Sequence, residues 1–102
     1  MTSSKPVSHL SFVRASAGRS VELGERLQQL LEPCRQTPGC LHFSLQRSTC
    51  DADLWLLTGL WADQSALNDY FTSPSLQLFG ELAQTRLMDS LDLQTFMAPS
   101  AG

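Results

Sequence analysis

The chain has 102 residues, a charged fraction of 17% and a formal net charge of −3 at pH 7. This length suffices for one domain with a single hydrophobic core. The seven Lys and Arg residues are spread along the chain and form no basic stripe, which argues against nucleic acid as the main partner. No apolar run reaches the roughly 18 residues that a membrane span needs, and the N-terminal residues lack the apolar core of a secretion signal. We therefore expect a cytoplasmic protein with no membrane partner.

The low charged fraction has two interpretations, because a soluble domain usually carries about 25% charged residues. Either a second subunit covers part of the surface, or the surface is solvated and rich in Ser, Gln and Thr. The three cysteines, Cys34, Cys40 and Cys50, form no Cys-x-x-Cys pair. In a cytosolic chain such cysteines are most simply reduced and partly buried.

The chain is predicted to form one domain between two loose tails. Residues 1–6 and 98–102 are rich in Ser, Pro, Ala and Gly, a composition typical of unstructured ends. No internal repeat interrupts residues 7–97, which we expect to fold as the single domain.

The sequence of the first half of this domain predicts a strand, a helix and an edge strand. The first strand is predicted over residues 7–16. Leucines at helical spacing predict a helix over residues 20–35, and Pro33 should bend or shorten its last turns. Apolar and polar residues alternate over residues 41–46, which is typical of a strand with one buried face at the edge of a sheet.

The second half begins with the most apolar segment of the chain. Residues 54–61 are apolar on both alternating faces, as expected for a central strand that is covered on both sides. Asp63 can cap the helix that follows, and Thr72 or Ser73 can cap a second short helix. Alternation over residues 91–97 predicts a fourth strand.

The predicted order of elements is βαββαβ, with the second helix split in two. Right-handed crossovers applied to this order give an α+β fold of the ferredoxin-like kind, with an antiparallel four-stranded sheet. Its first and third strands are central. The helices can cover only one face of this sheet, and the other face is also apolar, so we expect a homodimer that packs through the open face.

Three segments carry a resemblance to a known family over roughly residues 7–97. They are Pro33-Cys34-Arg35 followed by Pro38-Gly39-Cys40-Leu41, then Leu60-Trp61-Ala62-Asp63 with Ala66-Leu67, and Ser73-Pro74 followed by Leu76 and Phe79. These segments resemble a helix end, the exit of the third strand and the last helix of the antibiotic biosynthesis monooxygenase family. The resemblance implies a dimeric α/β barrel, since the family members are small dimeric proteins of this architecture.

The resemblance also implies a chemistry. Members of this family oxidise quinols or phenolic polyketides with O₂, often without a metal, flavin or haem. An electron-rich hydroquinone can reduce O₂ itself once it is deprotonated, so the protein need only bind the ring, remove a proton and exclude water. We therefore expect a cofactor-independent monooxygenase that acts on a small aromatic, quinol or polyketide-type ligand. The alternatives are a non-catalytic small-molecule-binding or stress-response protein of the same fold, and a polyketide isomerase or cyclase.

The sequence departs from the family pattern at three polar positions. Gly59 stands where members often carry Glu, and Tyr70 and Ser75 stand where they often carry His. Haem-degrading relatives need a helical His to ligate iron, and no His follows His42. The sequence therefore excludes haem binding of that kind.

The predicted substrate-binding residues are Trp61, Tyr70, Phe71, Ser75, Phe79 and Arg14. Trp61 is the expected wall for a flat substrate, with core packing as its alternative. Tyr70 is expected to donate a hydrogen bond to a quinol oxygen, with a surface hydroxyl as its alternative. Arg14 can anchor an anionic substrate or form an ion pair at the dimer edge.

The predicted catalytic base is His42 or His9, with Tyr70 as a third catalytic candidate. These two histidines are the groups that titrate near pH 7 without a large shift. The alternative for each is that it is an exposed or hydrogen-bonded histidine of its strand and does not act as a base. Two isolated histidines without a carboxylate cluster make no metal site, so we predict no metal. That no cofactor is needed is what the family resemblance implies.

Overall fold

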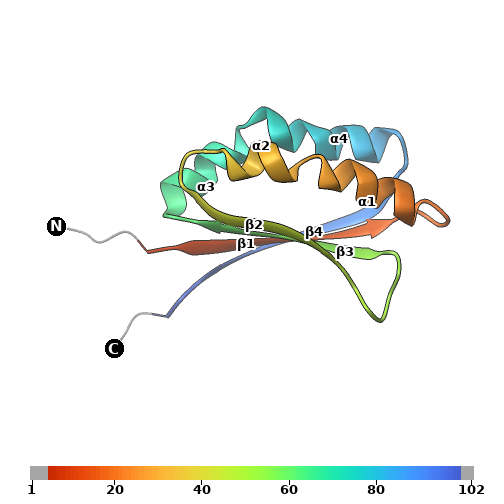
Figure 1. Cartoon of the computed structure of the whole chain (residues 1–102), viewed down its shortest axis with the longest axis horizontal. Coiled ribbons are helices and arrows are strands. Elements are labelled where there is room, and N and C mark those ends of the chain that lie inside the picture. Colours follow the sequence, from red (N-terminus) through yellow and green to blue (C-terminus); the bar gives the residue numbers. More distant parts are fainter. Residues whose placement is uncertain (1–4, 100–102) are drawn as a thin grey trace.

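The chain folds as strands and helices in the predicted order (Figure 1). The computed structural model describes residues 5–99, except for the side chains of Ser75 and Leu78. The elements are β1 (Val7–Ala15), α1 (Ser20–Gln28), α2 (Leu31–Arg35), β2 (Cys40–Arg47), β3 (Leu54–Trp61), α3 (Gln64–Phe71), the 3₁₀ helix η1 (Pro74–Leu76), α4 (Gln77–Gln84) and β4 (Met88–Met97). Most of each predicted tail lies outside the described residues.

The four strands form one antiparallel sheet in the order β2-β3-β1-β4. This order confirms the ferredoxin-like α+β fold, with β1 and β3 in the centre and β2 and β4 at the edges. Figure 1 shows the helices on one face of the sheet and the other face without a covering layer. The two faces therefore have different roles.

The core lies between the helices and the sheet. Alternate residues of β1, from Val7 to Ala15, are buried on the helix side, because successive side chains of a strand point to opposite faces. Leu23 and Leu27 of α1 pack against them and are completely buried. Burial of such apolar area on one helix face stabilises the helix far more than its intrinsic propensity does.

The predicted helix over residues 20–35 is wrong in one respect, because it is two helices. Residues 29 and 30 separate α1 from α2, and their backbone N–H groups bond to carbonyls three residues earlier. Pro33 has no N–H to offer the Gln29 carbonyl, and its ring would clash with that carbonyl in a continuous helix. The break therefore falls one turn before the proline.

The helix caps after β3 confirm one prediction and contradict another. Asp63 caps α3, with its Oδ1 accepting a hydrogen bond from the backbone N–H of Ala66 at 2.8 Å. The predicted cap at Thr72 or Ser73 is wrong. The Ser73 hydroxyl instead donates to the Tyr70 carbonyl at 2.7 Å, and the Thr72 hydroxyl donates to Asp69. Both hydroxyls thus satisfy the end of α3, since its last carbonyls have no helical partner.

The uncovered face of the sheet is apolar along its two central strands. Half-buried side chains project from this face; they are Leu10, Phe12, Leu54, Leu56 and Leu60. Phe96 of β4 lies on the same face and is exposed. Together these six side chains form what we call the open face.

Candidate functional site

Aromatic side chains from four elements meet on the helix side of the sheet, near the end of β3. Trp61 of β3 stacks on Tyr70 of α3, with ring centroids 4.7 Å apart. Phe43 of β2 contacts Tyr70 with centroids 6.0 Å apart. On the other side, the ring of His9 meets Phe71 edge-on at 5.0 Å and Tyr70 at 6.2 Å. We call these five residues the aromatic cluster.

Trp61 is the most deeply placed member of the aromatic cluster. Its side chain is completely buried, and its Nε1–H has no hydrogen-bond partner among the described residues. The indole lies against Gly59, where an added Cβ atom would come within 2.8 Å of Nε1. Because Gly59 carries no side chain, the indole can fold into the core. An unpaired buried N–H is costly, which makes Trp61 an available donor if a ligand oxygen reaches it.

Tyr70 is buried, so the alternative of a surface hydroxyl is wrong. Burial, and secondly the neighbouring thiol of Cys34, raise the pKa of the Tyr70 phenol well above its usual range. The phenol therefore stays protonated near neutral pH. Tyr70 can act as a hydrogen-bond donor but not as a base.

His9 lies at the edge of the aromatic cluster and has the chemistry of a base. Only 4% of its surface is exposed, and its Nδ1 is 3.1 Å from the Oγ1 atom of Thr95 on the neighbouring strand. Burial lowers the pKa of the His9 imidazole. The ring is consequently neutral near pH 7, and a neutral imidazole can accept a proton.

An exposed apolar surface adjoins His9 along β4. Leu93 and Met97 flank Thr95 on the side of β4 that faces the helices, as the pairing with β1 shows. Their exposed fractions are 48% and 56%, and that of Phe71 is 38%. We call Phe71, Leu93, Thr95 and Met97 the β4 shelf. Small ligands are held mainly by apolar and aromatic side chains with a few polar groups among them, and His9 with the β4 shelf offers both kinds.

His42 lies away from this group, on the other face of the sheet. It pairs with Leu60, whose side chain belongs to the open face, and it is exposed. His42 lines a hollow of about 340 Å³ together with Arg35, Cys40, Leu41 and Phe43, so Phe43 alone of the aromatic cluster borders it. The structure therefore brings His9, and not His42, to the aromatic cluster.

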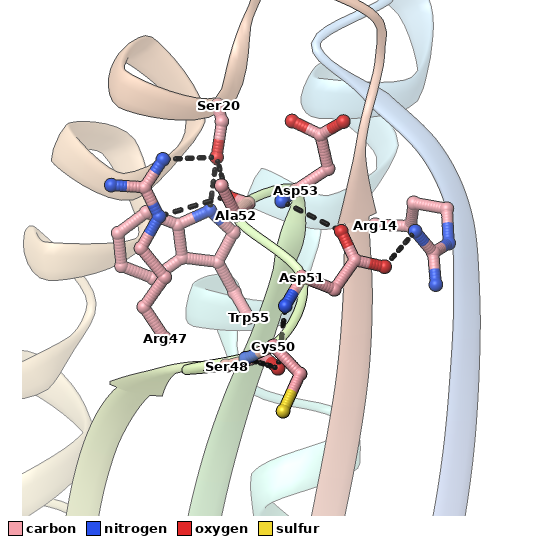
Figure 2. A network of polar contacts seen from close by, with 9 residues as sticks. All are labelled: Arg14, Ser20, Arg47, Ser48, Cys50, Asp51, Ala52, Asp53 and Trp55. Atoms are coloured by element: carbon pink, nitrogen blue, oxygen red, sulfur yellow. Dashed lines mark hydrogen bonds and ion pairs between the residues drawn. The ribbon is translucent and has the colours of Figure 1, made fainter.

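Arg14 is also remote from the aromatic cluster. It is five residues from His9 on β1 and on the opposite face, about 16 Å along the strand. Its Nη1 donates to Oδ2 of Asp51 at 2.6 Å (Figure 2). This bond raises the pKa of Arg14 and lowers that of Asp51. The guanidinium is thus already engaged within the chain.

Phe79 and Ser75 are the two remaining residues of the predicted substrate-binding set. Phe79 of α4 is buried in the core. The side chain of Ser75 lies outside the described part of the structure.

Two residues of the candidate site, Phe43 and Thr95, were not predicted from the sequence. Phe43 could have been found from its inward position in the alternation of β2, whereas Thr95 carries no local signal.

Within residues 5–99, no group of three or more His, Cys, Asp or Glu side chains is placed to hold a metal ion. None of the helices in this part of the chain is long and apolar enough to cross a membrane.

The fold and the aromatic cluster define a ferredoxin-like α+β domain with a candidate small-molecule site where His9 adjoins the exposed β4 shelf. Residues 6–82 match the family model described as antibiotic biosynthesis monooxygenase. The chain therefore belongs to the antibiotic biosynthesis monooxygenase family, which confirms the resemblance seen in its sequence motifs. Among curated proteins, none matches this sequence.

Solved structures of low sequence identity share the fold over almost the whole chain. A protein of Pseudomonas aeruginosa is 21% identical with a TM-score of 0.86, and the match covers 98% of this chain and all (100%) of the other. A candidate antibiotic biosynthesis monooxygenase from Deinococcus radiodurans is 20% identical, with a TM-score of 0.83 and coverages of 93% and 94%. SnoaB, a cofactor-independent oxygenase from Streptomyces nogalater, is 15% identical, with a TM-score of 0.77 and coverages of 96% and 97%.

Proposed function

We propose that this protein is a cofactor-independent monooxygenase that oxidises a small aromatic, quinol or polyketide-type substrate with O₂. The observation that carries the proposal is the position of His9, a buried neutral imidazole at the edge of the aromatic cluster and beside the exposed β4 shelf. Membership of the family and the likeness to SnoaB, itself a cofactor-independent oxygenase, support the same reaction class.

The chemistry requires no external reductant. In an anthrone, a CH₂ group lies between two aromatic rings and opposite a carbonyl group. Removal of one of its protons gives an electron-rich enolate that can react with O₂ directly. Oxidation of CH₂ to C=O supplies four electrons, one oxygen atom enters the new carbonyl, and the other leaves as water with the two hydrogens. The protein contributes a base, orientation and a site from which water is excluded.

Each role can be assigned to a residue of the candidate site. His9 removes the proton, because it is the histidine on the helix side of the sheet. Phe71 on the β4 shelf contacts the substrate ring, and Trp61 and Tyr70 form the apolar wall behind it. Tyr70 donates a hydrogen bond to a substrate oxygen if its hydroxyl turns away from Cys34.

We further propose that the active form is a homodimer. The open face presents apolar side chains across the central strands of the sheet, Leu10, Phe12 and Leu56 among them. Contiguous apolar patches of this kind are rarely left in contact with water. A second copy packed through the same face would cover both surfaces at once.

The test is oxygen uptake by the purified protein with a panel of anthrones and hydroquinones, corrected for spontaneous oxidation. We expect saturable uptake that falls at least about 100-fold in His9→Asn, since a positioned general base contributes that much. His42→Asn is the matched control and should keep the wild-type rate. Equal loss in both variants, or uptake unchanged in His9→Asn, would refute the assignment of the base.

A second candidate function is binding without turnover. The observation that favours it is that the Tyr70 hydroxyl lies beside Cys34 in the core and that Trp61 Nε1 is enclosed. A ligand that co-purifies and is not consumed under air would support this alternative. Product formed from a polyketide in the absence of O₂ would instead indicate an isomerase or cyclase.

A further inference from the structure

The hydrogen bond between His9 and Thr95 raises the question of which imidazole nitrogen is left to take a proton. Nδ1 of His9 lies 3.1 Å from Oγ1 of Thr95, its direct partner in the pairing of β1 with β4. Among the described residues, Nε2 has no hydrogen-bond partner, and it is not among the completely enclosed unpaired atoms. Nε2 is therefore the nitrogen that a ligand can reach.

We propose that Thr95 is a positioning residue that holds His9 in the Nδ1–H tautomer, with Nε2 unprotonated and free to accept the substrate proton. The proposal rests on the proposed function for the identity of that proton donor and for the direction of the bond between His9 and Thr95. The hydrogen bond made by one ring nitrogen determines the protonation of the other.

The direction of the bond follows from what the hydroxyl and the ring must do during turnover. A threonine hydroxyl can donate or accept. If it accepts from Nδ1–H, the same bond persists when Nε2 takes up a proton, because both nitrogens of the imidazolium are donors. If it donated to Nδ1, proton uptake would require the hydroxyl to turn. The accepting arrangement therefore needs no reorganisation when the proton moves.

The surroundings of His9 favour a neutral ring with one fixed tautomer. Its cross-strand partners, Gly59 and Thr95, carry no charge. The titratable side chain that contacts it from α3 is Tyr70, which stays protonated. Phe71 packs edge-on against the ring at 5.0 Å and limits its rotation. In this environment the hydroxyl of Thr95 is the group that distinguishes the two nitrogens.

The experiment is a long-range ¹H–¹⁵N correlation spectrum of the untagged full-length protein labelled with ¹⁵N-histidine. The chain has two histidines, so His42→Asn leaves the signals of His9 alone. We expect wild-type His9 to be protonated on Nδ1, Thr95→Val to shift it to the Nε2–H form, and Thr95→Ser to keep the wild-type form. An Nε2–H tautomer in the wild type, or an unchanged tautomer in Thr95→Val, would overturn the proposal.

Valine keeps the shape and strand preference of threonine, and Thr95 is an exposed residue of an edge strand. If Thr95→Val nevertheless fails to fold, the tautomer of His9 in the wild type still tests the proposal, since an Nε2–H form would overturn it. In the oxygen-uptake assay we expect Thr95→Val to lower kcat by about tenfold with little change in KM, and Thr95→Ser to recover it. No uptake by the wild type would refute the proposed oxygenase, whereas the spectrum would still report on Thr95.

Discussion

The indole nitrogen of Trp61 lies over Gly59, so close that a methyl group at residue 59 would have its carbon 2.8 Å from Nε1. The same added carbon would be 3.1 Å from the ring of Phe43. The absence of a side chain at Gly59 and the burial of Trp61 are thus one structural feature. A carboxylate side chain at this position, as the resemblance implies for other family members, would require the indole to move.

We therefore expect Gly59→Ala to destabilise the protein by about 1–3 kcal/mol, because the ring of Trp61 or Phe43 must shift to make room. Gly80→Ala is the control. An added Cβ at Gly80 meets nothing within 4 Å, and alanine in a helix is favoured over glycine by about 0.5–1 kcal/mol. Urea denaturation of both variants measures the difference. Equal stability of the two variants would contradict this account of Gly59.

Ser20 joins the β2–β3 hairpin to the start of α1. Its hydroxyl donates to the Ala52 carbonyl and accepts from Nε1 of Trp55 at 3.0 Å and from Arg47 at 3.1 Å (Figure 2). We expect Ser20→Ala to destabilise the protein by about 1–3 kcal/mol, because the half-buried indole N–H of Trp55 loses its partner. Ser90→Ala, at an exposed position on β4, should change stability by less than about 0.5 kcal/mol. Chemical denaturation monitored by tryptophan fluorescence would compare them, and a loss of equal size in Ser90→Ala would argue against the network.

Protonation of His9 should make stability depend on pH in a defined direction. Burial lowers the pKa of His9 below its ordinary value of 6.5, so the unfolded chain binds a proton at pH values where the folded chain does not. The free energy of unfolding should therefore decrease as the pH falls from 6.5 toward the lowered pKa. The hydrogen bond from Arg14 lowers the pKa of Asp51 from 3.8, so its contribution is lost only at more acidic pH.

We expect His9→Asn to flatten the pH dependence of stability between about pH 7 and pH 5, because the titrating group is gone. Thermal unfolding at several pH values across this range, followed by circular dichroism, measures the pH dependence of stability. His42→Asn keeps His9 and should show the wild-type slope. An identical slope in wild type and His9→Asn would mean that the burial of His9 does not affect its protonation.

The alternation of apolar and polar residues along the strands predicted most of the fold, because the local sequence of a strand indicates which of its faces is buried. The same rule separates the two histidines. His9 is two residues from Val7 and shares its buried face, whereas His42 is next to Phe43 and points to the other side. The position of Pro33 predicted a disturbance of the helix, and the location of the break one turn earlier follows from the carbonyl that proline would meet.

The contacts that build the candidate site could not be predicted from the sequence, because they join residues that are far apart along the chain. Thr95 reaches His9 only through the register of β1 with β4, across 86 residues of chain. Register is set by the whole sheet and its buried face, not by the residues around either partner. Likewise, the stacking of Trp61 on Tyr70 depends on how α3 docks on the sheet.

The open face supplies the last prediction, on assembly. Each chain has a mass of 11.2 kDa, and we expect light scattering at micromolar concentration to give twice this value. Leu56 lies on the open face at the centre of β3, so Leu56→Lys would place a charge in the interface, where an unpaired charge is strongly unfavourable. We expect this variant to have the mass of one chain. Val21→Lys is the control, because Val21 is exposed on α1 and its replacement should leave the dimer intact. A wild-type mass of one chain would contradict the dimer, and a dimeric Leu56→Lys would place the interface elsewhere.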